Sequence, residues 1–238
     1  MRASRCFRTD AEGRITLDSD WLKLLRGAQA VGPLVLQTGH VHARLIALTE
    51  MPAFVETPDG SAVDSDDGAL QFSFAGWARA WGSLRPCACC DSPAQVDVCN
   101  AAGRDFLELC ALPNGDAASW AEYLGALASP VLAPHPEPTS LGALPLMPAS
   151  VFRLRGGVPA LVSLLMMLGA ENVPVVGTLR TPEAAHTREF VPRHTAVENG
   201  VLSAGEARGC VQLALCAMGG LALQHTRMGW ALYVAGFA

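Results

Sequence analysis

The residues of this chain best suited to chemistry are histidines and arginines that occur in two clusters. The first cluster is the sequence TGHVHAR, in which His40, His42 and Arg44 are separated by single residues. Side chains two positions apart on a strand point to the same face, so the spacing predicts two imidazoles and a guanidinium on one side of a sheet. Imidazole binds metal ions and guanidinium pairs with carboxylates. A hydrogen-bonded pair on a sheet face is the structural alternative.

The second cluster is the sequence AAHTREFVPRH, with His186, Arg188, Arg193 and His194. Its polar composition predicts a loop. Two imidazoles and two guanidinium groups could bind a metal ion and acidic groups together, and a solvated surface loop is the alternative interpretation. Of the remaining histidines, one lies in a proline-rich stretch and one in a C-terminal hairpin, and we expect both to be structural or exposed: His135 and His225.

Three of the eight cysteines lie close together beside Pro86, at Cys87, Cys89 and Cys90. Thiols at this spacing could bind a soft metal or react with an oxidant. A closed zinc site needs a second pair of ligands at suitable spacing, and the sequence has none. Four further cysteines lie in apolar patterns that predict small buried side chains: Cys99, Cys110, Cys210 and Cys216.

No catalytic motif is present. The sequence contains no G-x-S-x-G, Walker A, G-x-G-x-x-G or H-E-x-x-H pattern, so no catalytic residue is predicted. Gly156 and Gly157 follow two arginines and could bind an anion at a helix N-terminus, and a packing turn is the alternative.

Composition narrows the class of protein. With 17 basic residues and a net charge of −5, the chain has no basic stripe for nucleic acid. The longest nearly apolar run, 158–170, is too short to span a bilayer, which predicts no membrane insertion. The first twenty residues have no apolar stretch typical of a secretory signal, so we expect a cytoplasmic protein with reduced thiols.

The first 130 residues predict an α+β region with a large antiparallel sheet flanked by helices. Apolar periodicity predicts a helix from Asp18 or Ser19 to Ala28 and another through Trp120, with Asp116 as its N-cap. Alternating patterns predict strands near 34–38, 41–49, 53–56, 69–74 and 94–112, the last being a hairpin that turns at Gly103.

Prolines concentrated in 131–149 predict an extended connector between domain 1–130 and a second α+β region, 150–238. In that second region we expect a helix over 160–168 and a strand over 173–178. The sequence SAGE at 203–206 is a capping box, which predicts a helix burying Val211, Leu213, Leu215 and Ala217 or their neighbours. A final hairpin pairs 221–226 with 230–234.

Three segments, in order, resemble the bacterial haem-utilisation family of HemS-like haemin-trafficking and haemin-degrading proteins. Residues 12–36 resemble the family's opening helix and first strand, and 70–81 its strand leading into a W-x-H-A-F phrase. Residues 94–128 resemble the segment in which an FDAAG phrase turns into a strand and a tryptophan-containing helix. Long family members contain two tandem halves, which implies that 150–238 is a trimmed copy of the first half.

The resemblance implies haem as the cofactor. His42 matches the histidine of a family V-H-E phrase and is the implied iron ligand, with Arg44 as a propionate partner. Phe72 and Phe74 would form an apolar wall, and His186 with Arg188 is the second candidate pair. The sequence departs from the family at the axial ligand. The family's axial histidine lies at the start of the helix opening the second half, and the corresponding residues 156–165 contain no histidine.

The sequence therefore predicts a cytoplasmic protein that binds and traffics haem, or another flat apolar ligand, rather than one that turns it over. Two alternatives stay open: a haem-degrading oxygenase-like enzyme, and a scaffold that has lost haem and serves as an interaction or regulatory protein. A homodimer is also left open.

Overall fold

The computed structural model describes residues 9–10, 12–40, 43–85, 92–131, 152–153, 157–215, 218–226 and 229–236, with backbone alone for 152–153, 157 and the segments after 215. Antiparallel sheets and three helices confirm the α+β class. None of the helices in these ranges is long and apolar enough to cross a membrane.

The chain folds into two compact units whose sequences interleave. Unit 1 comprises 1–39, 46–139 and 178–187, and unit 2 comprises 40–45, 140–177 and 188–238. A short segment from before the proline-rich connector thus lies in unit 2, and a short segment from after it lies in unit 1.

Unit 1 is built on an antiparallel sheet with the strand order β1-β7-β8-β9-β2-β3. Its strands are β1 (Ile15–Thr16), β2 (Leu34–His40), β3 (Ala43–Thr49), β7 (Trp77–Ser83), β8 (Gln95–Asn100) and β9 (Asp105–Ala111). The predicted hairpin of β8 and β9 is confirmed, and Gly103 turns it with a φ of +73°. A second sheet contains β4 (Phe54–Glu56), β5 (Ser61–Asp64) and β6 (Leu70–Ser73), and the short helix η1 (Phe74–Gly76) follows.

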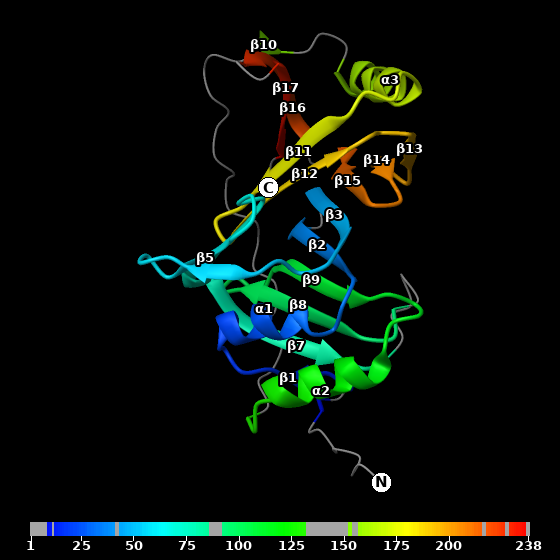
Figure 1. The fold of residues 1–238 in the computed structure, drawn as a ribbon. Helices are drawn as coiled ribbons and strands as arrows, with labels where there is room; N and C mark the ends of the chain where they lie inside the picture. Colours follow the sequence, from blue (N-terminus) through cyan, green and yellow to red (C-terminus); the bar gives the residue numbers. More distant parts are fainter. Residues whose placement is uncertain are drawn as a thin grey trace. The chain divides into compact units, whose positions relative to one another are not determined.

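Helices α1 (Trp21–Gln29) and α2 (Ala117–Leu127) lie together against the first sheet of unit 1 (Figure 1). Asp116 caps α2 as predicted, since its carboxylate accepts from the Ala118 amide at 2.9 Å. Helix α1 begins slightly later than predicted, because the carboxylate that caps it is Asp20, which accepts from the Lys23 amide at 3.0 Å. Leu24, Leu124 and Trp120 from the two helices are fully buried in this core.

In unit 2 the first residues of β3 are followed in the strand order by β15, β14 and β13. The bounds of its elements are β13 (His194–Glu198), β14 (Val201–Glu206), β15 (Gly209–Ala214) and α3 (Gly157–Ala170). The hairpin of β11 (Val175–Arg180) and β12 (Ala184–Phe190) is divided between the units. Strands β10 (Phe152–Arg153), β16 (Met218–Thr226) and β17 (Gly229–Gly236) form a small sheet, which confirms the predicted final hairpin.

The helix predicted from the capping box at 203–206 is wrong. These residues lie in β14, which pairs with β13 on one side and β15 on the other. Leu202 and Ala204 are buried, and three of the residues expected to be buried by a helix, Val211, Leu213 and Leu215, recur at every second position as in a strand. The backbone hydrogen bonds of β14 to both neighbouring strands stabilise the extended conformation more than the capping box stabilises a helix.

Gly169 lets the end of α3 approach the backbone at Pro192. A Cβ at this position would overlap the Pro192 carbonyl oxygen and crowd Arg193. We expect Gly169→Ala to destabilise the protein by about 1–3 kcal/mol through overpacking, although alanine is the better helix former by about 1 kcal/mol. Thermal unfolding measures this, with Ser163→Ala on the exposed side of α3 as the control, expected to be neutral or slightly stabilising. A stabilised Gly169→Ala variant would contradict the close approach.

Candidate functional site

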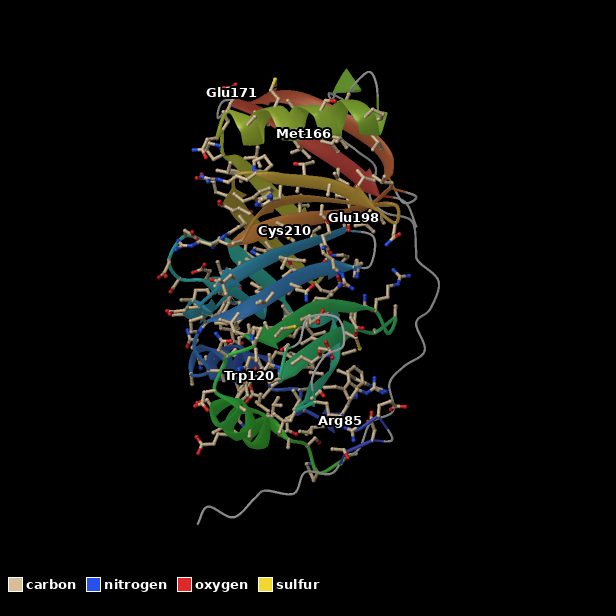
Figure 2. All side chains as sticks on the ribbon, turned by 90° about the vertical axis from the view of Figure 1, so that its right-hand side faces the viewer. Arg85, Trp120, Met166, Glu171, Glu198 and Cys210 are labelled. Carbon is tan, nitrogen blue, oxygen red and sulfur yellow. The ribbon has the colours of Figure 1, made fainter. Side chains whose placement is uncertain are left out.

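Helix α3 of unit 2 contains residues 157–165, the stretch in which the sequence resemblance implies an axial histidine and this chain has none. Its inner side is closed, because Leu161 and Leu165 pack on Leu202, Ala204 and Leu213 of the unit 2 sheet. Its outer side has no charged residue, and Met167 is 57% exposed there, as is Met166, which Figure 2 labels. The helix therefore has an apolar outer side and a closely packed inner side, and none of its side chains offers a nitrogen ligand for a metal ion.

The opposite face of the unit 2 sheet is polar. Ala43 packs on the cluster under α3, so the next residue of β3, Arg44, projects to the far side. In β15 the same alternation puts Cys210 on the far side, where the strand register aligns it with Gly205 of β14 and, beyond that, with His194 of β13. This far face offers a partly exposed guanidinium at β3 and an exposed imidazole at β13.

The first predicted cluster, His40, His42 and Arg44, is divided where β2 ends. His40 is the last residue of β2, whereas Arg44 lies in β3, so the two do not share one continuous strand as expected. His40 and Arg44 are both partly exposed, and both belong to unit 2. His42 lies outside the described residues.

The second predicted cluster is not a loop. His186 and Arg188 lie in β12, which pairs antiparallel with β6 so that His186 is opposite Leu70. His186 is 3% exposed, and its Nδ1 lies 2.9 Å from the Thr38 hydroxyl in unit 1. The alternation of Ala184, His186 and Phe190 with more exposed residues was the strand signal that the polar composition concealed.

Phe72 and Phe74 belong to an aromatic core around Trp77 in unit 1. The Trp77 ring lies 5.4 Å from Phe72 and 5.1 Å from Phe74 in edge-on geometry, measured between ring centroids. Trp21 and Phe106 complete the cluster at 5.4 and 5.3 Å. Phe72 is only 1% exposed, so these two rings act as packing residues of this unit.

Sequence reasoning missed a buried carboxylate beside that core. Glu183, in the turn before β12, is 5% exposed and accepts a hydrogen bond from the Asn100 side-chain amide at 2.8 Å. Its backbone carbonyl accepts from the Ser73 amide at 2.9 Å and from the Trp77 indole N–H at 3.3 Å. Glu183 therefore connects the turn before β12 with the end of β6, the start of β7 and the end of β8. The only sequence signal was a glutamate between Pro182 and an apolar strand, which is common in exposed turns.

Two of the three cysteines in the described part of the chain are buried. Cys99 and Cys110 are buried as predicted, and burial raises the pKa of the Cys99 thiol to about 11, which keeps it protonated at neutral pH. Cys210 was predicted to be buried and is partly exposed, so that prediction is wrong. Within those ranges no three His, Cys, Asp or Glu side chains converge as metal ligands, and Cys87, Cys89, Cys90, His135 and Cys216 lie outside them.

Comparison with solved structures identifies the fold. The chain is similar to holo-PhuS, a haem-binding protein from Pseudomonas aeruginosa, with a TM-score of 0.72 and 13% identity over 94% of this chain and 78% of that one. Apo-PhuS gives 0.70 at 13% identity over 92% and 76%. The haem-degrading enzyme ChuS of Escherichia coli O157:H7 gives 0.69 at 12% identity over 94% and 78%.

The sequence itself matches no known protein-family profile, and no curated protein is similar to it at a significant level. The likeness to PhuS and ChuS extends over nearly the whole chain. The fold implied by the sequence resemblance is thus confirmed, and this chain has the fold of PhuS and ChuS.

Proposed function

We propose that this chain binds haem and serves haem utilisation as a binding and trafficking protein. The observation that carries the proposal is the likeness of 94% of the chain to a haem-binding protein in its haem-bound form, at a TM-score of 0.72. The resemblance of three ordered sequence segments to the haem-utilisation family supports the same proposal.

A haem site needs an axial ligand, basic groups for the propionates and an apolar surface. Because α3 has no histidine and its inner side is filled by leucines, the ligand proposed is His42, the histidine whose place in the sequence resembles that of a family histidine. His42 would hold the iron and Arg44, partly exposed on the polar face, would pair with a propionate. Bound haem would supply the iron chemistry, and the chain's part is to hold and orient it.

Titration of the purified protein with haemin tests the proposal. Binding is expected to give a saturable shift of the Soret band and a rise in the melting temperature, since a ligand that binds only the folded state stabilises it. An unchanged spectrum together with an unchanged melting temperature would refute haem binding.

His42→Ala is expected to change the iron spin state and to weaken haemin binding by on the order of 10–100-fold, as loss of other metal-site groups does. His194→Ala is the matched control: this imidazole lies at the far edge of the same sheet, in β13, and its removal should change little. A His42→Ala variant with wild-type spectrum and affinity would overturn the ligand assignment while leaving haem binding itself intact.

Turnover is the second candidate, because ChuS shares the fold and degrades haem. The two functions separate when a reductant and oxygen are added to the haem-loaded protein. A trafficking protein should retain its Soret band under conditions in which a degrading enzyme bleaches it and releases a defined open-chain tetrapyrrole.

A further inference from the structure

The sheet of unit 1 carries two partly buried acidic groups on the face away from α1 and α2. In β8, Val96 and Val98 face the core, so Asp97 projects to the opposite side. Its direct cross-strand neighbour in β9 is Glu108. Like charges placed directly opposite each other on a sheet are destabilising, and this pair is also partly buried.

The hydrogen-bond donors at this pair are neutral. The Gln95 side-chain amide donates to Asp97 Oδ2 at 2.9 Å, and the Cys110 thiol donates to Glu108 Oε1 at 3.2 Å. From β2, Gln37 donates to the Cys110 sulfur at 3.8 Å. None of these contacts brings a positive charge to either carboxyl group.

The charged groups on this face are mainly acidic. Asp105 from β9 adds to the negative field at Asp97, and Arg14, just before β1, opposes it. The Arg14 guanidinium lies over the Trp81 ring at 5.8 Å and already pairs with Asp10 at 2.8 Å and Glu12 at 3.0 Å. Arg79 of β7 acts on the neutral Cys99 thiol.

These surroundings favour the protonated acid. The pKa of the Asp97 carboxyl is raised to about 7, mainly by burial and in addition by the charges of Glu108 and Asp105, against the lowering effect of the Gln95 hydrogen bond and of Arg14. A carboxyl group with this pKa changes charge within the physiological range, which an exposed aspartate does not.

We propose that Asp97 carries a proton in the folded protein, and that loss of this proton places two carboxylates face to face and loosens the pairing of β8 with β9. The carboxyl pair thus makes the stability of the β8–β9 pairing in unit 1 depend on pH. The proposal is independent of haem binding.

The direction of the effect follows from proton binding. Between the unfolded pKa near 3.8 and the folded value near 7, the folded protein holds a proton that the unfolded chain releases. The stabilising contribution of Asp97 is therefore complete below about pH 4 and is lost as the pH rises through 7.

The primary test is a carboxyl ¹³C NMR titration of the full chain, in which Asp97 should titrate near neutral pH. Urea unfolding between pH 5 and 8 is the second measurement. Asp97→Asn keeps the shape of the protonated acid, so it should be more stable than wild type at pH 8. The pH dependence of the unfolding free energy should differ between the two proteins by about one proton. Comparing the two proteins removes the contribution of the histidines, which both contain.

Two further variants make the test specific. Glu108→Gln removes the opposing charge, so the Asp97 transition should move to lower pH, an effect that a purely structural role of Glu108 would not produce. Asp59→Asn is the control, because this exposed carboxyl has a pKa lowered by the Thr57 hydroxyl and should leave the pH profile above 5 unchanged. An Asp97 titration below pH 5, or an Asp97→Asn variant with the wild-type pH profile, would overturn the proposal.

Discussion

Replacing Asn100 by aspartate is expected to cost about 3–5 kcal/mol of unfolding free energy, the range for an uncompensated charge in a protein interior. The Asn100 amide donates to the Glu183 carboxylate at 2.8 Å, and both residues are buried. Its carbonyl oxygen accepts from the amides of Ala102 and Arg104, each at 3.0 Å. Aspartate preserves those two contacts but turns the donor into an acceptor, so two carboxylates would meet without solvent.

The loss should be reversed by a second change. In Asn100→Asp/Glu183→Gln the amide and carboxylate exchange positions, and one donor again faces one acceptor, so most of the stability should return. The Asn100→Asp variant should also regain part of its stability at pH 5. Two carboxyl groups at this distance take up a proton in the folded state, so a lower pH favours folding.

Asn172→Asp is the matched control, since the exposed Asn172 uses its carbonyl oxygen to accept from Arg193 at 2.6 Å, a contact that aspartate keeps. Its effect should stay within about 0.5 kcal/mol. Urea unfolding followed by circular dichroism measures all four proteins. A loss below about 1 kcal/mol in Asn100→Asp, or no recovery in the double variant, would show that this pair is not a buried tie.

The elements that sequence predicted correctly depend on local signals. The α2 helix combines an aspartate cap with an apolar stripe that includes Trp120 and Leu124, and the hairpin of β8 and β9 combines alternation with a glycine turn. Each signal lies within about ten residues, so no distant contact is needed to interpret it.

The failures are places where distant partners decide. The capping box at 203–206 is a valid local helix signal, but β13 and β15 pair with this segment on both sides and hold it extended. His186 looked like part of a polar loop because its partners, Thr38 and the strand β6, are far away in sequence.

The candidate site was predictable only in part. The spacing of His40, His42 and Arg44 predicted polar side chains on one face of a sheet, yet the end of β2 at His40 depends on pairing that spacing does not encode. The Asn100–Glu183 bond joins residues 83 positions apart, and no motif connects them. A buried polar pair of this kind becomes visible only when the two turns are brought together.

Trp77→Ala is the other large effect, with an expected loss of about 3–5 kcal/mol, as for large-to-small changes of aromatic core residues. Trp77 is 6% exposed and its ring contacts Trp21, Phe72, Phe74 and Phe106 with centroid separations of 5.1–5.4 Å. Each such ring pair adds roughly 0.5–1.5 kcal/mol beyond area burial, and a cavity would be left among the four neighbours.

Trp77→Phe separates the two contributions of this residue. Phenylalanine keeps an aromatic ring in the cluster but loses the indole N–H that donates to the Glu183 carbonyl at 3.3 Å, so a smaller loss of about 1–2 kcal/mol is expected. Val55→Ala, at a side chain 57% exposed, should stay within about 0.5 kcal/mol. Circular dichroism is the suitable probe, because both Trp77 variants alter tryptophan fluorescence directly. If Trp77→Ala were no less stable than Trp77→Phe, the ring cluster would not be the stabilising centre of unit 1, and the polar tie through Glu183 would have to account for the stability instead.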